Sequence, residues 1–312
     1  MSLGTNLKAT LFHHSTHLSD QDLMAPGNSC PFCASMTRQP IAILQEVPEV
    51  SLLYCHSCHG ASASRMPEPK ALEKYYSHYY DDKDEKVTLD TPDRMACHIQ
   101  RHAGSSLGNI TGRDLCILDY GGGDGSISIR LALRLLAQGA EKVSITLVDY
   151  DRTTIDASDE RILISRPESL DDIPEQSMDL VVASAVIEHV PEPRDVLTKL
   201  FYSLKPRGVF YARTPYVAPL SSLAKMFGVP FDFTYPAHVH DLGARFWNNV
   251  TNALPLVGKY QTIRSTPSIV ETTFGQHFLR TLVAHMLKIP GYVFKESYGL
   301  VGGWEVFIQR TS

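Results

Sequence analysis

A glycine-rich loop with acids on both sides is the stretch of this sequence whose residue types most directly suggest binding chemistry. In the segment LDYGGGDGS the glycines Gly121, Gly123 and Gly125 lie between and after the carboxylates of Asp119 and Asp124. Glycines let a backbone approach a ligand closely because they carry no side chain. Glycine loops that open a helix usually bind phosphate, but two carboxylates repel an anion and attract a cation. The loop is therefore predicted to hold a cationic ligand.

The residues after the glycines exclude two phosphate-binding loops. A P-loop requires Lys followed by Ser or Thr after its last glycine, whereas Ser126 and Ile127 stand there in this chain. The dinucleotide fingerprint read from Gly121 requires Gly or Ala at its sixth position, which is again Ser126. S-adenosylmethionine fits what remains, since it carries a sulfonium, an ammonium and a ribose diol but no phosphate. We therefore expect the loop to bind S-adenosylmethionine.

Two cysteine pairs predict a structural zinc site. Cys30 and Cys33 form one pair, Cys55 and Cys58 form the other, and 21 residues separate the inner members. Each pair can close a tight turn that directs two thiolates to one point, and two such turns complete a tetrahedron around Zn²⁺. The segment between them is expected to form two short strands with Pro48 in the turn. Four thiolates leave no open position for catalysis; redox dithiols or chance spacing are the alternatives.

Strands and helices alternate through the region that must position the glycine loop. Alternation of this kind predicts an α/β fold with a doubly wound, mostly parallel seven-strand sheet. Ligands of such sheets bind beyond the carboxyl ends of the strands, where the glycine loop would lie. The seven expected strands cover residues 114–120, 142–151, 161–165, 177–186, 209–215, 260–270 and 304–310.

These features resemble the seven-strand, Rossmann-like (class I) S-adenosylmethionine-dependent methyltransferases, in particular the bacterial group that carries an N-terminal zinc ribbon. The resemblance covers most of residues 30–247, and its segments follow the family's order. The usual loop of the family has Cys or Ser between its glycines, whereas this chain has YGGGDG. In addition, TPY replaces the common TPN. Neither change removes a group that the cofactor needs. The segments that carry the resemblance are CPFC…YCHSCHG, RMPEPKALEKYYSHYY, ILDYGGGDGSISIRLA, LVDYD, SMDLVVASAVIEHVPEPRDVLTKLFYSLKPRGVFYARTP and HVHDLGARFW.

The resemblance implies cofactor roles for the loop and for the end of the second strand. The three loop glycines would pass beneath the methionine and ribose parts of the cofactor, and Asp119 would orient the loop or bind the ammonium. Asp149, 24 residues after Gly125, would accept hydrogen bonds from the ribose hydroxyls, with a surface acid as the alternative. Tyr150 would cover the face of the adenine.

Three histidines are candidates for a catalytic base. Methyl transfer needs alignment above all, but an alcohol or phenol acceptor also has to lose a proton. His189, just after the fourth strand, would stand at the mouth of the cofactor site; a structural role in its loop is the alternative. Glu188 beside it is expected to brace that loop. His238 and His240 would serve as base or bind the acceptor, and no third partner for a metal site is evident near them.

The chain is expected to comprise a zinc ribbon and a methyltransferase domain, with an aromatic-rich and a helical insertion shaping the acceptor site. The helical insertion would otherwise be a dimer face or cover the core. The expected parts are an N-terminal tail (1–28), the ribbon (29–66), a helical connector (67–105) and the methyltransferase domain (106–312), with the insertions near 217–245 and 271–296.

The composition of the chain limits the kinds of molecule that it is expected to bind. A net charge of −5 over 312 residues gives no general attraction for nucleic acid, and no apolar run approaches the ~20 residues that span a bilayer. We expect a cytoplasmic enzyme, since the first residues do not resemble a secretion signal. The expected acceptor is a hydroxyl of a sugar, a glycan intermediate or a secondary metabolite. An RNA or protein methyltransferase that uses the ribbon for recognition, a non-catalytic cofactor-binding module and a homo-oligomer remain open alternatives.

Overall fold

The computed structural model describes residue 9 and residues 17–79, 92–150, 155–275 and 277–312. Most of the expected tail and the middle of the expected connector lie outside these residues. Within the described residues, no helix is both long enough and apolar enough to cross a membrane.

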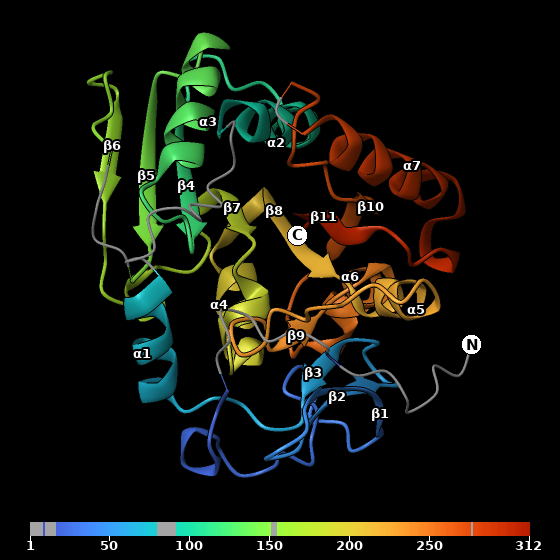
Figure 1. Cartoon of the computed structure of the whole chain (residues 1–312). Helices are drawn as coiled ribbons and strands as arrows, with labels where there is room; N and C mark the ends of the chain where they lie inside the picture. The colour runs from blue at the N-terminus through green and yellow to red at the C-terminus, as the bar shows by residue number, and fades with distance from the viewer. Residues whose placement is uncertain (1–8, 10–16, 80–91, 151–154, 276) are drawn as a thin grey trace.

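A seven-stranded sheet forms the centre of the molecule and confirms the expected fold (Figure 1). Its strand order is β10-β11-β8-β7-β4-β5-β6, and β11 runs antiparallel to both of its neighbours while the other pairs are parallel. The order reverses beside β4, so the loop after β4 lies at the switch point where such sheets bind ligands. The strands are β4 (Asp114–Tyr120), β5 (Lys142–Val148), β6 (Ile162–Ser165), β7 (Met178–Ser184), β8 (Leu204–Tyr216), β10 (Tyr260–Pro267) and β11 (Gly302–Arg310).

Helices cover both faces of this sheet because consecutive strand residues point to opposite sides. In β4, Ile117 packs with α2 and α3 on one face, and Leu118 packs with α4 and α6 on the other. Both side chains are fully buried. The helices are α1 (Pro69–Tyr79), α2 (Pro92–Leu107), α3 (Ser126–Ala137), α4 (Pro193–Tyr202), α5 (Ala218–Met226), α6 (Ala244–Ala253) and α7 (Phe278–Phe294).

A second, four-stranded sheet contains the cysteine segment. Its order is β1-β2-β3-β9, where β1 (Arg38–Gln45), β2 (Val50–Cys55) and β3 (Ala61–Ala63) come from the N-terminal part of the chain. The two strands expected around Pro48 are β1 and β2, which pair antiparallel. The fourth strand, β9 (His240–Asp241), belongs to the insertion after β8 and pairs with β3. The N-terminal segment and the methyltransferase region are therefore joined in one sheet, which the sequence did not indicate.

Two strand ends differ from the expected ones at the edge that carries the site. β5 ends at Val148 and β7 ends at Ser184, whereas the sequence patterns continued to residues 151 and 186. After β7 the backbone turns, with a positive φ of 57° at Ala185, and enters the 3-10 helix η5 (Ile187–His189). Because of this turn, Glu188 and His189 do not continue in the direction of β7.

Candidate active site

The glycine loop joins β4 to α3 at the carboxyl edge of the sheet. Gly125 is the N-cap of α3 and adopts a φ of 82°, in the left-handed region that favours glycine. Gly122, which the sequence pattern did not single out, is the tightest position of the loop. A Cβ atom at this residue would lie 2.3 Å from Oδ2 of Asp119 and 2.6 Å from Cδ1 of Leu147. The loop is therefore pressed against the end of β4 and β5.

Asp119 lies beneath the loop and is almost completely buried, with 2% of its surface exposed. Burial raises the pKa of this carboxyl to about 7. Its Oδ2 atom has no hydrogen-bond partner within the described part of the chain. A buried acceptor without a donor is costly, so this position is suited to a donor supplied from outside the chain.

The peptide of Gly123 is held from two sides. Its amide donates a hydrogen bond to Oδ2 of Asp149 across 2.8 Å, and its carbonyl accepts one from Nη2 of Arg166 across 3.0 Å. Asp149 follows the end of β5, as expected, whereas the role of Arg166 was not anticipated. Tyr150 is fully exposed to solvent.

Two of the candidate histidines meet beyond the end of β7, and an acid joins them. The rings of His189 and His238 are in edge contact, with centroids 4.7 Å apart. Nε2 of His189 is 3.9 Å from Oε1 of Glu188. Ligand atoms of all three residues lie within 4.8 Å of one another. The histidines thus have the third partner that the sequence did not reveal.

Glu188 is the most unusual member of this cluster. It has no exposed surface, and neither carboxylate oxygen has a hydrogen-bond partner within the described residues. Burial raises its pKa to about 8. The chain two residues before Glu188 lies next to the glycine loop, because a Cβ atom at Gly121 would be only 2.3 Å from Cγ2 of Val186. The glycine loop and the segment that carries the cluster therefore share one edge of the sheet.

His240 lies outside the cluster. Its Nδ1 contacts the Ser62 hydroxyl of β3 at 3.0 Å, and its Nε2 contacts the Val190 carbonyl at 2.7 Å. Burial lowers its pKa to about 3, so the ring is neutral. With both nitrogens engaged, His240 is placed to connect β3 with the segment after η5.

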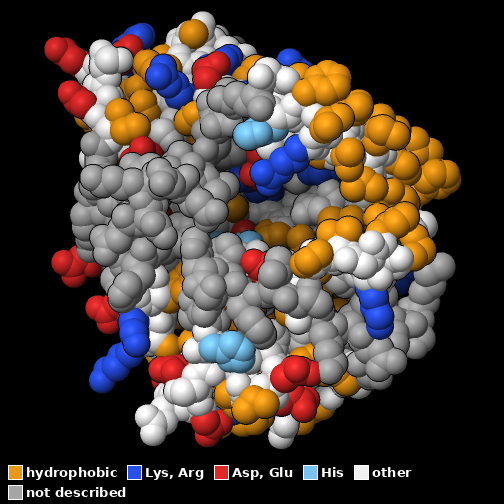
Figure 2. Space-filling view, in the orientation of Figure 1, with side chains coloured by type: hydrophobic (Ala, Val, Ile, Leu, Met, Phe, Trp, Pro, Cys, Tyr) orange, Lys and Arg blue, Asp and Glu red, His pale blue; other side chains and the backbone are white. Residues whose placement is uncertain are grey.

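A hollow opens in the face shown in Figure 2, and the apolar surface of α7 borders it. A small pocket lies nearby, between the four-stranded sheet and the insertion after β8. Leu44 and Leu52 line its ribbon side, and Val217, Phe233 and His238 belong to the insertion side. The ribbon strands therefore contribute to the surroundings of a candidate catalytic residue.

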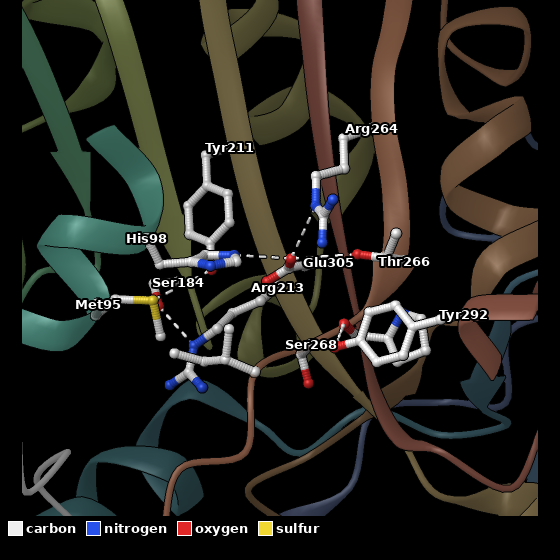
Figure 3. Close-up of polar contacts among 12 residues, drawn as sticks. Met95, His98, Ser184, Tyr211, Arg213, Arg264, Thr266, Ser268, Tyr292 and Glu305 are labelled. Atoms are coloured by element: carbon white, nitrogen blue, oxygen red, sulfur yellow. Dashed lines mark hydrogen bonds and ion pairs between the residues drawn. The ribbon is translucent and has the colours of Figure 1, made fainter. Parts of the chain in front are cut away.

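Two buried charged side chains, Arg213 of β8 and Glu305 of β11, lie opposite each other on neighbouring strands (Figure 3). Nε of Arg213 in β8 donates to the Ser184 hydroxyl across 2.7 Å, and its guanidinium pairs with Glu271. Glu305 in β11 is fully buried and accepts from His98 of α2 at 2.8 Å. In the sequence, each of these two residues appears as a charged residue within an apolar strand. The sequence does not reveal the partner of either one.

The four paired cysteines come together as expected from their spacing. Sγ of Cys30 is 3.5 Å from Sγ of Cys58, and Sγ of Cys33 is 3.6 Å from Sγ of Cys55. Zn–S bonds of ~2.3 Å in a tetrahedron separate sulfurs by about 3.8 Å, so this donor set fits zinc. Arg38 donates to the carbonyls of Gly27, Ser29, Ser62 and Ala63 around the cluster.

The sheet order, the loop at its switch point and the acid after the second parallel strand define an α/β protein of the doubly wound class. Residues 88–251 match the family described as a methyltransferase domain, and the chain belongs to this family. The protein is thus a methyltransferase. No curated protein matches its sequence.

Solved structures with a similar fold include other methyltransferases. An S-adenosylmethionine-dependent methyltransferase from Mesorhizobium loti is 16% identical, with 68% of this chain and 97% of that chain covered and a TM-score of 0.42. The 1,6-didemethyltoxoflavin-N1-methyltransferase of Burkholderia thailandensis, solved with bound 1,6-didemethyltoxoflavin and S-adenosylhomocysteine, is 14% identical. The match covers 77% of this chain and 87% of the Burkholderia chain, with a TM-score of 0.42.

Proposed function

We propose that the protein transfers a methyl group from S-adenosylmethionine to a hydroxyl group of a small molecule, such as a sugar, a glycan intermediate or a secondary metabolite. The observation that carries this proposal is that the glycine loop contacts Val186, two residues before the cluster of Glu188, His189 and His238, at the edge of the sheet where β4 and β7 end. Bound S-adenosylmethionine would supply an electrophilic methyl group on a sulfonium. The family match supports the reaction, and the cluster supports an acceptor that must lose a proton.

The cofactor roles proposed for the loop follow from its chemistry. Asp119 would receive the ammonium group, since its buried Oδ2 requires a donor. Asp149 would accept hydrogen bonds from the ribose hydroxyls while it holds the amide of Gly123. Because Gly122 has no Cβ atom, the loop backbone can lie close to Asp119 and Leu147, as this binding mode requires. Tyr150 is exposed and would become covered when it meets the adenine face.

The base proposed for the acceptor hydroxyl is the pair of histidines. His189 contacts the Ala237 carbonyl through Nδ1 at 2.9 Å, which places the proton on Nδ1 and leaves Nε2 to accept one. The acceptor hydroxyl would lose its proton to Nε2 of His189 or to His238 as its oxygen gains the methyl group, and S-adenosylhomocysteine would leave as the second product. In its ionised form, Glu188, 3.9 Å from that nitrogen, would stabilise the protonated ring.

We further propose that the cysteine cluster holds a structural zinc ion. Its sulfur separations match a tetrahedral site, and the cluster belongs to the hydrophobic core that contains α4 and α6. Phe32, between the cysteines of the first pair, packs on His240 and on Phe246 of α6, with ring centroids 4.8 Å and 4.6 Å away. The ion would thereby stabilise the acceptor side of the site.

Titration calorimetry with S-adenosylmethionine and S-adenosylhomocysteine tests the cofactor, and a screen of hydroxylated acceptors with radiolabelled cofactor tests the reaction. We expect binding of both compounds and label transfer to an acceptor that bears a hydroxyl group. The same acceptor with that hydroxyl replaced by hydrogen should receive none. Absence of cofactor binding, or transfer that persists without the hydroxyl, would overturn the proposal.

A further inference from the structure

Helix α7 presents an apolar face to the outside of the molecule. Along this helix the exposed side chains include Leu279, Val283, Met286, Ile289 and Val293, whose spacing of three and four residues places them in one stripe. Leu279 is 73% exposed and Val293 is 70% exposed. Single exposed apolar residues are common, but a continuous stripe of this length marks a contact surface.

The side of α7 that faces the protein carries polar as well as apolar side chains. Lys288 is buried there, and its ammonium donates to the Ser268 carbonyl at 2.7 Å and to the Ser268 hydroxyl at 2.9 Å. Thr281 is also buried and donates to the Thr272 hydroxyl across 2.8 Å. The apolar stripe is therefore not a core face that lost its cover, because a different face holds the helix in place.

Helix α5 extends the same surface. Met226 at its end and Phe227 after it are both 69% exposed. The segment after α7 contacts α5, since a Cβ atom at Gly299 would lie 3.0 Å from Cγ of Pro219. Both helices lie on the same side of the molecule in Figure 1, and Figure 2 shows apolar side chains over this region beside the hollow.

The charges around this surface are positive although the whole chain has a net charge of −5. Neither α5 nor α7 contains Asp or Glu. Exposed cations stand at Lys225 in α5, at Arg280 in the first turn of α7 and at Lys295 directly after α7. The nearest acid along the chain, Glu296, accepts a hydrogen bond from Asn248 of α6.

We propose that α7 and the end of α5 bind the surface of an anionic lipid bilayer. An apolar stripe bordered by Lys and Arg is the pattern of a helix that lies in the bilayer interface. At 17 residues, α7 is about 25 Å long and would lie along the surface. A second copy of this chain suits the surface less well, because a twofold contact would bring the cations of one patch against those of the other. This inference extends beyond the methyl transfer proposed above and does not depend on it.

Sedimentation with lipid vesicles tests the proposal on the full chain. We expect the protein to sediment with vesicles of equal parts phosphatidylglycerol and phosphatidylcholine, and less with phosphatidylcholine alone. The combined variant Leu279→Ser, Val283→Ser and Met286→Ser should bind the anionic vesicles at least about tenfold more weakly. The double variant Arg280→Gln and Lys295→Gln should lose the preference for anionic vesicles.

The matched control removes equally exposed apolar side chains elsewhere, through Met36→Ser, Val47→Ser and Val257→Ser, which are 66%, 78% and 77% exposed in the parent. This variant should bind vesicles as the parent does. The proposal is overturned if the parent stays in the supernatant or if the α7 variant binds unchanged. It is also overturned if light scattering shows that the parent is a dimer and the α7 variant is a monomer, while neither the parent nor the variant sediments with vesicles. Cofactor calorimetry on the same variants separates this outcome from a failure of the proposed reaction.

Discussion

The amide of Gly123 donates a hydrogen bond to Oδ2 of Asp149, so the glycine loop is tied to the residue that follows β5. The carboxylate proposed to hold the ribose also organises the backbone that passes beneath it. One acid therefore connects the two strands that form the cofactor side of the site. Its removal should affect ligand affinity more than the stability of the fold, since the contact is local and partly exposed.

Asp149→Ala should weaken S-adenosylmethionine binding by about 100-fold or more, because two charge-assisted hydrogen bonds to the ribose are lost. Titration calorimetry measures this change. Glu141→Ala is the matched control, since it removes an exposed acid just before the opposite end of β5. Retained affinity in Asp149→Ala would show that the ribose is bound elsewhere.

Gly122→Ala should destabilise the protein by about 2 kcal/mol or more and impair cofactor binding. The added Cβ would lie 2.3 Å from Asp119 and would displace its carboxylate or the loop. Gly104→Ala in α2 is the control, because nothing lies within 4 Å of its Cβ position. That variant should gain about 0.5–1 kcal/mol. Urea unfolding of both proteins provides the comparison, and equal stability of the two would contradict the proposed packing.

His189→Ala and His238→Ala should each lower turnover by about 10²–10⁴-fold with little change in cofactor affinity, if the pair serves as the base. The double variant should lose less than the product of the two single losses, because the rings act together. His285→Ala, an exposed ring on α7, serves as control. Full turnover in both single variants would exclude the pair from catalysis.

The buried carboxyl of Glu188 should make stability depend on pH. Because its pKa of about 8 in the folded chain lies above the unfolded value of ~4.3, the group favours folding at low pH. This contribution is lost as the pH rises from the unfolded to the folded value. Glu188→Gln cannot ionise, so its stability relative to the parent should rise by up to about 1.4 kcal/mol per pH unit across that range. Urea unfolding at several pH values measures the difference; a constant difference would show that Glu188 does not titrate in this way.

Purified protein should contain about one zinc ion per chain, and a strong chelator should lower its melting temperature. Cys30→Ser should do the same, whereas Cys97→Ser, outside the cluster, should not. Because Phe32 packs on His240, zinc loss should also reduce turnover in proportion to the metal removed. Metal analysis, calorimetric melting and activity on one preparation test this together. A zinc-free protein of unchanged melting temperature would contradict the site.

The sequence predicted the central sheet because its strands are long apolar runs separated by helices, which is a local signal. It also located the loop, the cysteines and the acid after β5. The pairing of β3 with β9 could not be predicted, because a strand of two residues has no periodicity. The meeting of Glu188 and His189 with His238 depends on a contact with the carbonyl of Ala237, 48 residues away from His189. Such contacts arise from tertiary packing and leave no pattern in the chain.

Similar limits apply to the charged residues within the sheet and on α7. Arg213 and Glu305 stand out in apolar strands, yet only the structure gives their partners. The sequence placed α7 in an insertion that shapes the acceptor site, with a dimer face or a cover of the core as the alternatives. The anchoring of Lys288 by Ser268 determines which face turns inward.

Because β3 pairs with β9, the four-stranded sheet can be completed only after β9 has been translated. Ser62 and its partner His240 are 178 residues apart, so at ~5–20 residues per second β3 waits roughly 10–40 s for its neighbour to leave the ribosome. All four cysteines emerge well before that moment, and metal can load onto them while the chain is still being made. Until Asp241 follows, β3 is an open strand edge of a kind that attracts other chains. Translation that stops between these points would therefore release a metal-loaded fragment prone to aggregation.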